Sequence, residues 1–439
     1  MTRRVAVIGG GIGGASAALR LAQTGVDVTL IERSPSLGGL VVSFEVAGTP
    51  LECFYHHIFP HEREIIGLID ELGLSGRLGW YPSSVGILRD GRFWPFTSPL
   101  DLLRFGPLSL VDRLRTGIGG LRLCRVGDWQ ELDQLPAQDW LRAYCGGPAV
   151  DVVWGPMLTA KFGPAAGDVP AAWMWGRFQQ RAGARKGGGE KLGYLRGGFR
   201  QLFEALDRTL RRAGVQVATE TAVSEIILNG DRVTGVETNA GTVDADAVLY
   251  TGPLPGLSRL VPEDRTDPRW GQVGGLGVIC VILELARPIS NVYWTNVCDP
   301  ALPFGGIIEH TNFVPSADYG GRHIAYLSRY FTSDEPIAGS DPTEEAVRWV
   351  DALVDRVDGL RRQDVLAVHP FKTPYGAPLV SVGHLDRIPP LQSHLDGLWV
   401  STTGQIYPQD RGMSEGVRTG TEAAAAIVAA GRTSVGGPR

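Results

Sequence analysis

The stretch Val5-Ala-Val-Ile-Gly-Gly-Gly-Ile-Gly-Gly14 decides the fold of this chain. Its first four residues are apolar and predict a short strand that is buried on both faces. Gly9, Gly11 and Gly14 follow at the spacing G-x-G-x-x-G, and residues 15–22 continue as a helix of small residues. At this spacing the glycines allow a tight turn, the approach of a pyrophosphate to the backbone, and close packing of the helix on the strand. The free N–H groups at the start of the helix would face the phosphates.

A second predicted strand, residues 27–31, ends at Glu32, which follows Gly14 by 18 residues. A carboxylate at this distance accepts hydrogen bonds from the hydroxyls of a ribose. It would repel a 2′-phosphate, so we expect a dinucleotide without one, although the neighbouring Arg33 leaves the other possibility open. The complete strand–turn–helix–strand–acid pattern favours a bound dinucleotide over a glycine-rich turn that binds nothing.

Composition limits the classes of protein to which the chain can belong. At 439 residues it is longer than one compact core requires, so we expect two domains. The net charge of −5 provides no general attraction to nucleic acid, and no nucleic-acid partner is expected. The five cysteines contain no C-x-x-C pair, so we expect neither a disulfide framework nor a metal site. No apolar run approaches the roughly 20 residues that span a bilayer, which makes the cytoplasm the simplest location.

A second glycine pair, Gly38-Gly39, follows Glu32 and precedes Leu40. A dinucleotide fingerprint, an acid and then a second glycine pair resemble the flavoproteins with two dinucleotide-binding domains. That group includes flavin-containing amine oxidases, protoporphyrinogen oxidases, phytoene desaturases and UDP-galactopyranose mutases. The resemblance implies FAD as the cofactor and an α/β fold. It implies a Rossmann-like FAD domain with a central parallel sheet, and an α+β substrate domain with an antiparallel sheet.

The resemblance covers nearly the whole chain and implies a discontinuous domain division. It places the FAD-binding domain at residues 1–80, 194–255 and 386–439, and the substrate-binding domain at residues 81–193 and 256–385. The residues that it assigns to FAD are Gly9, Gly11, Ile12, Gly13, Gly14, Glu32, Arg33, Gly38, Gly39, Leu40, His56, Val223, Gly252, Gly404, Gln405, Arg411, Gly412, Met413 and Ser414.

Three of these assignments have specific roles by resemblance. The backbone of Val223 would hold the adenine end of FAD. Gln405 stands where the family has an acid that binds the ribityl chain, and an amide can still hydrogen-bond to a hydroxyl. The helix that begins after Gly412 would direct its N-terminus at the N1–C2=O edge of the flavin. Because reduced flavin carries negative charge there, a positive helix end would favour reduction.

Tyr55, His56 and His57 are consecutive in a segment that the resemblance places beside the flavin ring, where amine oxidases usually have Gly-Pro. Histidine titrates near neutral pH, so His56 and His57 are candidate bases for an alcohol or amine proton. The alternative is that each is a hydrogen-bonded histidine in a packed turn. Weaker catalytic candidates are Tyr55, Lys161, Tyr375, Tyr407 and Arg411. Arg411 could clamp a phosphate or carboxylate, or bind the cofactor.

Residues 99–129 predict a helical layer with arginines on one side and leucines on the other. The simpler interpretation is a layer of the substrate domain with a solvated face. The alternative is a surface that touches a membrane or a lipid-linked substrate. Further along the chain, residues 187–189 are all glycine and predict a loop.

Several functions are compatible with this sequence. We expect an FAD-dependent dehydrogenase or oxidase, in which flavin N5 takes a hydride from an alcohol, amine or C–C bond of a small polar or sugar-like metabolite. The alternatives are a non-redox sugar-nucleotide mutase, a desaturase of an apolar substrate, and a non-enzymatic FAD-binding protein of the Rab-escort type. The intact glycines and the histidine pair argue against the last of these. Fold alone does not fix the reaction, and the electron acceptor and oligomeric state stay open.

Overall fold

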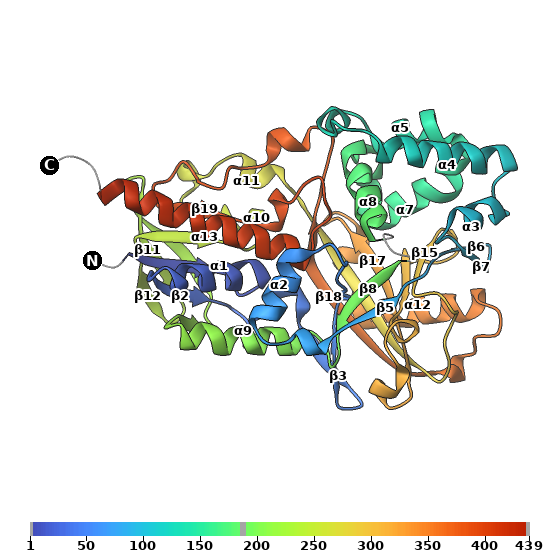
Figure 1. Ribbon diagram of the computed structural model, residues 1–439, viewed down its shortest axis with the longest axis horizontal. Helices are drawn as coiled ribbons and strands as arrows, with labels where there is room; N and C mark the ends of the chain where they lie inside the picture. The colour runs from blue at the N-terminus through green and yellow to red at the C-terminus, as the bar shows by residue number, and fades with distance from the viewer. Residues whose placement is uncertain (1–2, 185–189, 436–439) are drawn as a thin grey trace.

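The computed structural model describes residues 3–184 and 190–435. Figure 1 shows both ends of the chain at one side of the molecule and the helices labelled α3, α4 and α5 at the opposite side. The glycine loop predicted at residues 187–189 lies outside the described residues.

A five-stranded parallel sheet contains the predicted first strand at its centre. The strand order is β19-β13-β1-β2-β9. The strands are β1 (Arg4–Ile8), β2 (Asp27–Ile31), β9 (Gln216–Ala218), β13 (Ala247–Tyr250) and β19 (Leu398–Val400). Val5 and Val7 pack among the helices α1 (Ile12–Gln23), α9 (Arg200–Arg212) and α13 (Met413–Val435), whereas Ala6 packs on the opposite face. Burial on both faces explains why β1 is apolar throughout its centre.

A three-stranded antiparallel meander covers that opposite face of the parallel sheet. Its strands are β10 (Val223–Asn229), β11 (Arg232–Thr238) and β12 (Gly241–Asp244). On the helical side, α13 packs against α1 at very close range. A Cβ added to Gly420 would lie 2.2 Å from the carbonyl oxygen of Gly13, so only glycine permits this contact.

A seven-stranded sheet forms the second large unit, in the order β18-β14-β17-β16-β15-β6-β7. Its strands are β6 (Val85–Arg89), β7 (Arg92–Pro95), β14 (Gly275–Leu285), β15 (Trp294–Val297), β16 (Gly306–Glu309), β17 (His323–Phe331) and β18 (Val365–Pro378). All neighbours are antiparallel except β6 and β15. The predicted antiparallel sheet is therefore confirmed, and Asp90-Gly91 form the turn of the hairpin between β6 and β7.

The strand β18 is absent from the sequence prediction, which names only Tyr375 in this region, as a catalytic candidate. Pro370, Pro374 and Pro378 interrupt this strand and argue against a central position in a sheet. The structure resolves the conflict because β18 is the edge strand, paired with β14 alone. When the nitrogen of a proline in an edge strand faces outward, every hydrogen bond to the neighbouring strand can still form.

Residues 99–129 form two helices instead of one continuous layer. α3 (Pro99–Arg104) and α4 (Leu110–Cys124) are separated by a short turn in which Phe105 and Leu108 are buried. Ser98 and Ser109 cap the two helices by accepting a hydrogen bond from a backbone N–H in the first turn. The other helices of this layer are α5 (Ala137–Cys145), α6 (Gly147–Ala149), α7 (Gly155–Phe162) and α8 (Ala171–Ala184).

The remaining elements connect these units. They are β3 (Ser43–Val46), β4 (Thr49–Glu52), α2 (Arg63–Glu71), β5 (Leu78–Pro82), β8 (Lys191–Leu195), α10 (Leu254–Leu257), α11 (Arg269–Gln272) and α12 (Pro342–Arg356). The parallel sheet draws its strands from the predicted FAD segments, and the seven-stranded sheet from the predicted substrate segments. The β5–β8 pair runs across two of the predicted boundaries, and the division into two domains stays a prediction. In the described ranges, no helix combines the length and apolar character that crossing a bilayer requires.

Candidate functional site

The glycine turn between β1 and α1 is closed on one side and open on the other. A Cβ on Gly9 (φ +108°) would lie 2.6 Å from Oγ1 of Thr251, and one on Gly14 would lie 2.0 Å from the carbonyl oxygen of Gly9. Neither position tolerates a side chain. By contrast, a Cβ added to Gly11 would have no atom of the described residues within 4 Å, apart from those of its own residue and its two chain neighbours. The open space therefore lies in front of the N-terminus of α1, where a pyrophosphate is predicted to bind.

Glu32 lies at the end of β2 and faces this turn. Its carboxylate accepts a hydrogen bond from the backbone N–H of Gly10 (2.7 Å) and another from that of Ser34 (2.8 Å). The N–H of Thr221 donates to the carbonyl oxygen of Glu32 (2.9 Å), so the segment that leads to Val223 lies directly beside it. A carboxylate has about four acceptor positions, and the two that remain can accept ribose hydroxyls. The neighbouring Arg33 side chain is exposed.

The second glycine pair packs directly on the first motif. The N–H of Gly38 donates to the carbonyl oxygen of Gly10 (3.0 Å). A Cβ on Gly39 (φ +57°) would lie 3.2 Å from the Cα of Gly11. On the other side of the turn, Thr251 donates its N–H to the carbonyl oxygen of Ile8 (2.9 Å) and brings the predicted cofactor residue Gly252 beside it. The open space at Gly11, the uncapped start of α1 and the carboxylate of Glu32 together fit the adenosine diphosphate part of FAD.

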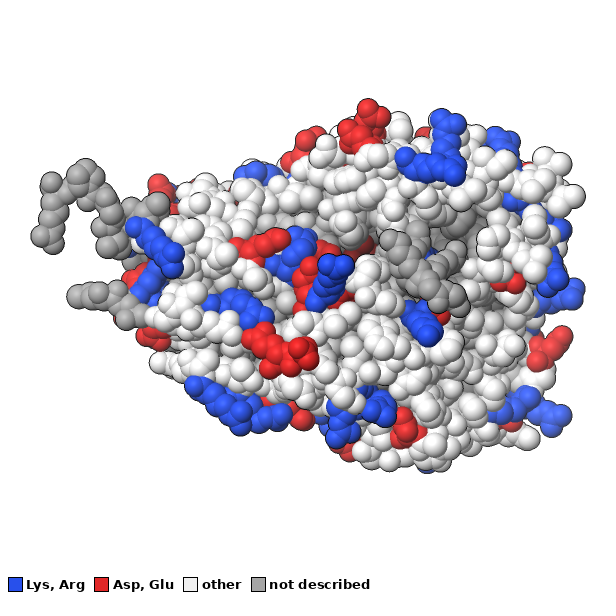
Figure 2. Space-filling view, viewed as in Figure 1, with Lys and Arg blue, Asp and Glu red and all other residues white. Residues whose placement is uncertain are grey.

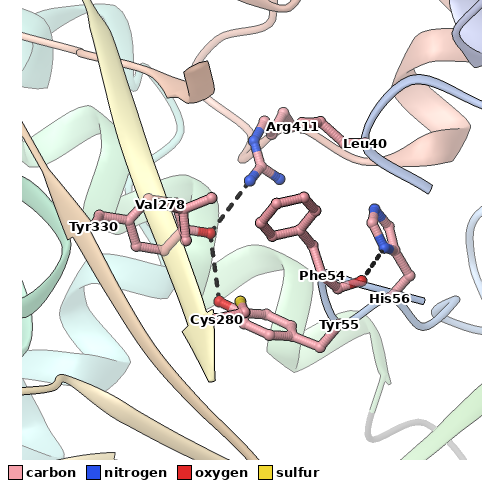
Figure 3. A pocket seen from close by; sticks show the side chains of 8 residues that line it. All are labelled: Leu40, Phe54, Tyr55, His56, Val278, Cys280, Tyr330 and Arg411. Atoms are coloured by element: carbon pink, nitrogen blue, oxygen red, sulfur yellow. Dashed lines mark hydrogen bonds between the residues drawn. The ribbon is translucent and has the colours of Figure 1, made fainter. Parts of the chain in front are cut away.

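A small cavity of about 30 Å³ lies between these elements and the seven-stranded sheet, and Figure 3 shows its lining. The lining residues are Leu40, Phe54, Tyr55, His56, Val278, Cys280, Tyr330 and Arg411. Half of these side chains are apolar, whereas we expected a small polar or sugar-like metabolite as the substrate. Val278 and Tyr330 are direct partners across the β14–β17 pair, which places their side chains on one face of the sheet.

A chain of polar side chains crosses the cavity. Arg411 donates from Nη2 to the hydroxyl of Tyr330 (3.2 Å), and the Tyr330 and Tyr55 hydroxyl oxygens lie 3.3 Å apart. Burial raises the pKa of Tyr55 well above its ordinary value, so its hydroxyl stays protonated. The Nε of Arg411 is buried, and it finds no hydrogen-bond partner within residues 3–184 and 190–435. Arg411 thus retains an unused donor at this site.

His56 lines the cavity as a neutral ring. Its Nδ1 lies 2.6 Å from the carbonyl oxygen of Phe54, and because a carbonyl can only accept, Nδ1 carries the proton. Burial, with a smaller effect of Arg411, lowers the pKa of His56 to about 4. At neutral pH, Nε2 therefore has a free lone pair, which suits a hydrogen-bond or proton acceptor.

His57 has different surroundings from His56, although the two are adjacent in sequence. Its Nδ1 lies 3.1 Å from the hydroxyl of Tyr293, and its ring packs edge-on against Phe59 and Trp294. Burial lowers its pKa to about 3. His57 does not belong to the cavity lining, and its surroundings match the packed-turn interpretation.

Beside the cavity, three cations surround one carboxylate. Lys161 Nζ lies 2.6 Å from Oδ2 of Asp410, and Arg177 Nη1 lies 3.1 Å from the same oxygen. Burial alone would raise the pKa of Asp410, but Lys161, Arg177 and Arg411 hold it well below its usual value. Burial lowers the pKa of Lys161 to about 8, although Asp410 acts in the opposite direction. With all four groups ionised, the cluster carries a net charge of two positive units.

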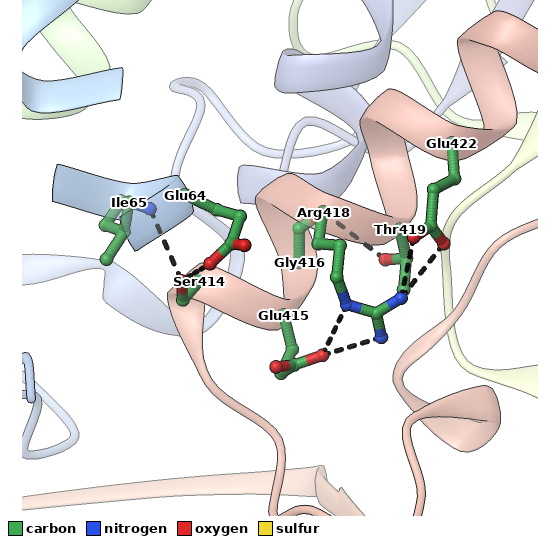
Figure 4. A network of polar contacts seen from close by, with 8 residues as sticks. All are labelled: Glu64, Ile65, Ser414, Glu415, Gly416, Arg418, Thr419 and Glu422. Atoms are coloured by element: carbon green, nitrogen blue, oxygen red, sulfur yellow. Dashed lines mark hydrogen bonds and ion pairs between the residues drawn. The ribbon is translucent and has the colours of Figure 1, made fainter. Parts of the chain in front are cut away.

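The start of α13 is surrounded by acids, as Figure 4 shows for part of it. The hydroxyl of Ser414 donates to Glu64 (2.8 Å), and Glu415 is bound by Arg418. Oε1 of Glu62 would lie 3.2 Å from a Cβ on Gly412, and burial raises the pKa of Glu62 to about 7. These carboxylates oppose the positive end of the helix dipole. The predicted effect of this helix end on flavin reduction stays a prediction.

Three predicted site residues have other structural roles. Gln405 donates to the carbonyl oxygens of Pro389 and Val400 (both 3.0 Å) and accepts from the N–H of Thr402, so its amide holds its own loop together. The hydroxyl of Tyr407 donates to Asp133 (2.5 Å), outside the cavity lining. Tyr375 also lies outside the lining, packed against Gly275. Gly404 and Met413 are buried, and Ile12 contacts Gly416 of α13.

Sequence reasoning missed several residues of the site. Phe54, Val278, Cys280 and Tyr330 line the cavity, and Asp410 and Arg177 complete the charged cluster. The period-two spacing of Val278 and Cys280 in a predicted strand could have indicated one shared face. The pairing of that strand with Tyr330 could not be read from the sequence.

Comparisons with known proteins agree with this geometry. The chain is 25% identical to coproporphyrinogen III oxidase of Propionibacterium freudenreichii subsp. freudenreichii over 89% of this chain and 84% of that protein. It is 24% identical to 4,4′-diaponeurosporene oxygenase of Staphylococcus aureus (strain Mu50) over 83% of this chain and 82% of that protein. The structure of reduced UDP-galactopyranose mutase superposes with a TM-score of 0.77 at 15% identity, over 98% of this chain and 94% of that one, which is a likeness of fold.

The sequence model of one family matches almost the entire chain, from residue 12 to residue 428. That family is described as flavin containing amine oxidoreductase. The match includes the second glycine pair, the cavity residues and the start of α13 described above. The chain therefore belongs to the flavin containing amine oxidoreductase family, and it is an FAD-dependent oxidoreductase.

Proposed function

We propose that this enzyme is a dehydrogenase or oxidase whose organic donor combines an apolar body with a negatively charged group. The observation that carries the proposal is the cluster of Lys161, Arg177 and Arg411 around the single carboxylate of Asp410, beside a half-apolar cavity. An excess of buried positive charge is unfavourable unless a counter-charge binds. A carboxylate or phosphate on the donor would supply that charge, and the unused Nε of Arg411 would donate to it.

The apolar side chains then bind the rest of the donor. Leu40, Phe54 and Val278 exclude water from the cavity and contact carbon. This combination modifies the expectation of a small polar or sugar-like metabolite, because half of the lining cannot hydrogen-bond. The curated relatives are named for a porphyrinogen and for diaponeurosporene, and their names are consistent with a partly apolar donor.

The residues of the cavity have distinct tasks in this proposal. FAD, when bound, supplies the group that accepts a hydride. Tyr55 and Tyr330 hold the donor through their hydroxyls, and Arg411 fixes its charged end. His56 accepts a hydrogen bond or a proton from the donor at Nε2. No other nucleophile is required for hydride transfer.

The test is anaerobic mixing of the holoenzyme with alcohols and amines that end in a carboxylate or phosphate, each paired with an uncharged counterpart of equal length. The flavin absorbance should bleach with charged donors and much less with neutral ones. Arg411→Gln should raise KM for the charged donors and leave KM for the neutral ones nearly unchanged. Equal bleaching by charged and neutral donors would contradict the proposal that the donor carries a negatively charged group. Bleaching by NADH or NADPH alone would favour a reductase or a mutase that works from reduced flavin.

A further inference from the structure

An apolar stripe lies along the solvent-facing side of α3 and α4. Of the twelve large apolar side chains that are exposed in the described part of the chain, seven lie within these two helices. They are Leu100, Leu103, Leu110, Val111, Leu114, Ile118 and Leu121, with exposed fractions between 41% and 74%. Single exposed leucines are common, but seven in one patch mark an interaction surface. We call this set the α3–α4 stripe.

The orientation of α4 is fixed by its opposite face. Thr116, Gly119 and Leu123 are buried, and a Cβ on Gly119 would lie 2.5 Å from Sγ of Cys145 in α5. Leu114, Ile118 and Leu121 repeat at intervals of four and three residues, which keeps them on one side of a helix. Since the buried face cannot leave α5, the α3–α4 stripe cannot turn into the core. The leucines, which the sequence predicted on the side opposite the arginines, thus face solvent.

Arginines border the stripe, and the contacts that the structure describes for three of them are with uncharged groups. Arg113 donates to the carbonyl oxygens of Leu103 and Leu108, Arg115 donates to that of Ala143, and Arg122 lies 4.1 Å from the ring centroid of Tyr144. A carbonyl or a ring offers no full negative charge.

Basic residues outnumber acids throughout this segment. Residues 99–125 hold five arginines and two aspartates, whereas the whole chain has a net charge of −5. Both aspartates bind the capping serines of α3 and α4. Figure 2 shows basic side chains along the upper right edge of the molecule, where Figure 1 places α4.

We propose that the α3–α4 stripe docks the enzyme on the surface of an anionic lipid bilayer. The apolar side chains would enter the boundary between headgroups and acyl chains, and the arginines would meet the lipid phosphates. The arginine border favours this occupant over a second copy of the chain, because a symmetric pair would place the same five cations against each other. In Figure 1 the parallel sheet lies at the opposite end from α4, so docking leaves the FAD-binding glycines away from the lipid.

The test is sedimentation of the full-length holoenzyme with vesicles of phosphatidylcholine, with and without phosphatidylglycerol. The double variant Leu114→Gln/Ile118→Gln keeps good helix formers at both positions. The matched control is Val347→Gln, which changes an exposed apolar residue of another helix, α12. We expect wild type and Val347→Gln to bind the anionic vesicles. We expect the partition coefficient of the double variant for these vesicles to be lower by about tenfold or more, since apolar burial drives insertion. Absence of wild-type binding, or equal binding by the double variant, would overturn the proposal.

A second variant tests the charge. Arg104 and Arg125 are exposed, and Arg104→Gln/Arg125→Gln should weaken binding to anionic vesicles and reduce its salt dependence. Flavin content and circular dichroism confirm that each variant is folded. Sedimentation velocity without lipid examines the competing occupant. One contrary result is that wild type self-associates, loses that association in Leu114→Gln/Ile118→Gln, and fails to bind vesicles. This result would assign the stripe to a dimer interface and reject the proposal of membrane docking.

Discussion

Lys161 on α7 and Asp410 in the loop before α13 lie 2.6 Å apart, although 249 residues separate them in sequence. Nζ of Lys161 is also 5.6 Å from the ring centroid of Tyr330, which lines the cavity. The pair therefore connects the helical layer, the loop that leads to α13, and the seven-stranded sheet. Its charge state affects both the stability of this junction and the binding of an anion beside it.

Removing the carboxylate should destabilise the enzyme. Asp410→Asn leaves Lys161 and Arg177 without their counter-charge in a largely buried place, which typically costs about 3–5 kcal/mol in the free energy of unfolding. Chemical denaturation measures this quantity. Asp151→Asn is the control, because the Arg142–Asp151 pair is half exposed and should contribute less than about 1 kcal/mol. Similar effects of the two substitutions would show that the cluster is not a buried charge system.

The low pKa of Lys161 predicts a pH dependence of stability. The pKa falls from 10.5 to about 8 in the folded enzyme. Between these pH values the unfolded chain binds more protons than the folded one. The contribution of Lys161 to the free energy of unfolding therefore increases as pH rises. Lys161→Met should lack that contribution. The difference in unfolding free energy between wild type and the variant, measured from pH 7 to pH 10, should increase in favour of wild type; a constant difference would refute the assigned pKa.

Replacing Glu52 should cause a second large loss of stability. Its buried carboxylate accepts from the hydroxyl of Tyr194 and from the N–H of Phe199, both at 2.6 Å, and Phe199 leads into α9. Glu52→Ala leaves both donors buried and unsatisfied, a loss of about 2–5 kcal/mol. Glu45→Ala on the adjacent strand removes only an exposed partner of Arg200 and should cost less than about 1 kcal/mol. Thermal unfolding of the three proteins ranks them, and equal melting temperatures would count against the role of Glu52.

His56 should be essential for turnover where His57 is not. His56→Asn removes the Nε2 acceptor from the cavity, and kcat/KM should fall about a hundredfold or more with unchanged flavin content. In wild type, activity should also decrease as pH falls toward 4, because a protonated His56 cannot accept; the variant should lack this decrease. His57→Asn, outside the cavity, should keep kcat/KM within a few fold. A fully active His56 variant would exclude the proposed role.

Elements with strong local signals could be predicted from the sequence. The glycine turn, the acid after β2 and the long helix after Gly412 follow from spacing and apolar pattern, and the structure has all three. The edge strand β18 could not be predicted, since its prolines oppose a strand unless its edge position is known. Gln405 was assigned by analogy with an acid, but its amide is used by its own loop.

Interactions between segments that are distant in the chain could not be predicted from the sequence. Asp410 lies next to Arg411 in the chain, yet its partners Lys161 and Arg177 come from helices whose placement depends on the complete fold. The separate surroundings of His56 and His57 depend on tertiary packing for the same reason. For the stripe, the division into a leucine side and an arginine side was visible, but which side faced solvent depended on how α4 packs on α5.

The flavin absorbance of purified Gly11→Val tests the central claim most directly. Beyond its chain neighbours, no atom in residues 3–184 and 190–435 lies within 4 Å of a Cβ at Gly11, so the substitution should leave folding intact while it fills the space predicted for the pyrophosphate of FAD. Gly67→Ala on α2 is the control, because a Cβ there also meets no described atom within 4 Å outside the nearby backbone of its own helix. The account predicts yellow wild type and control, and a folded, colourless, inactive Gly11→Val. Full FAD content in Gly11→Val would contradict the placement of the cofactor at this turn.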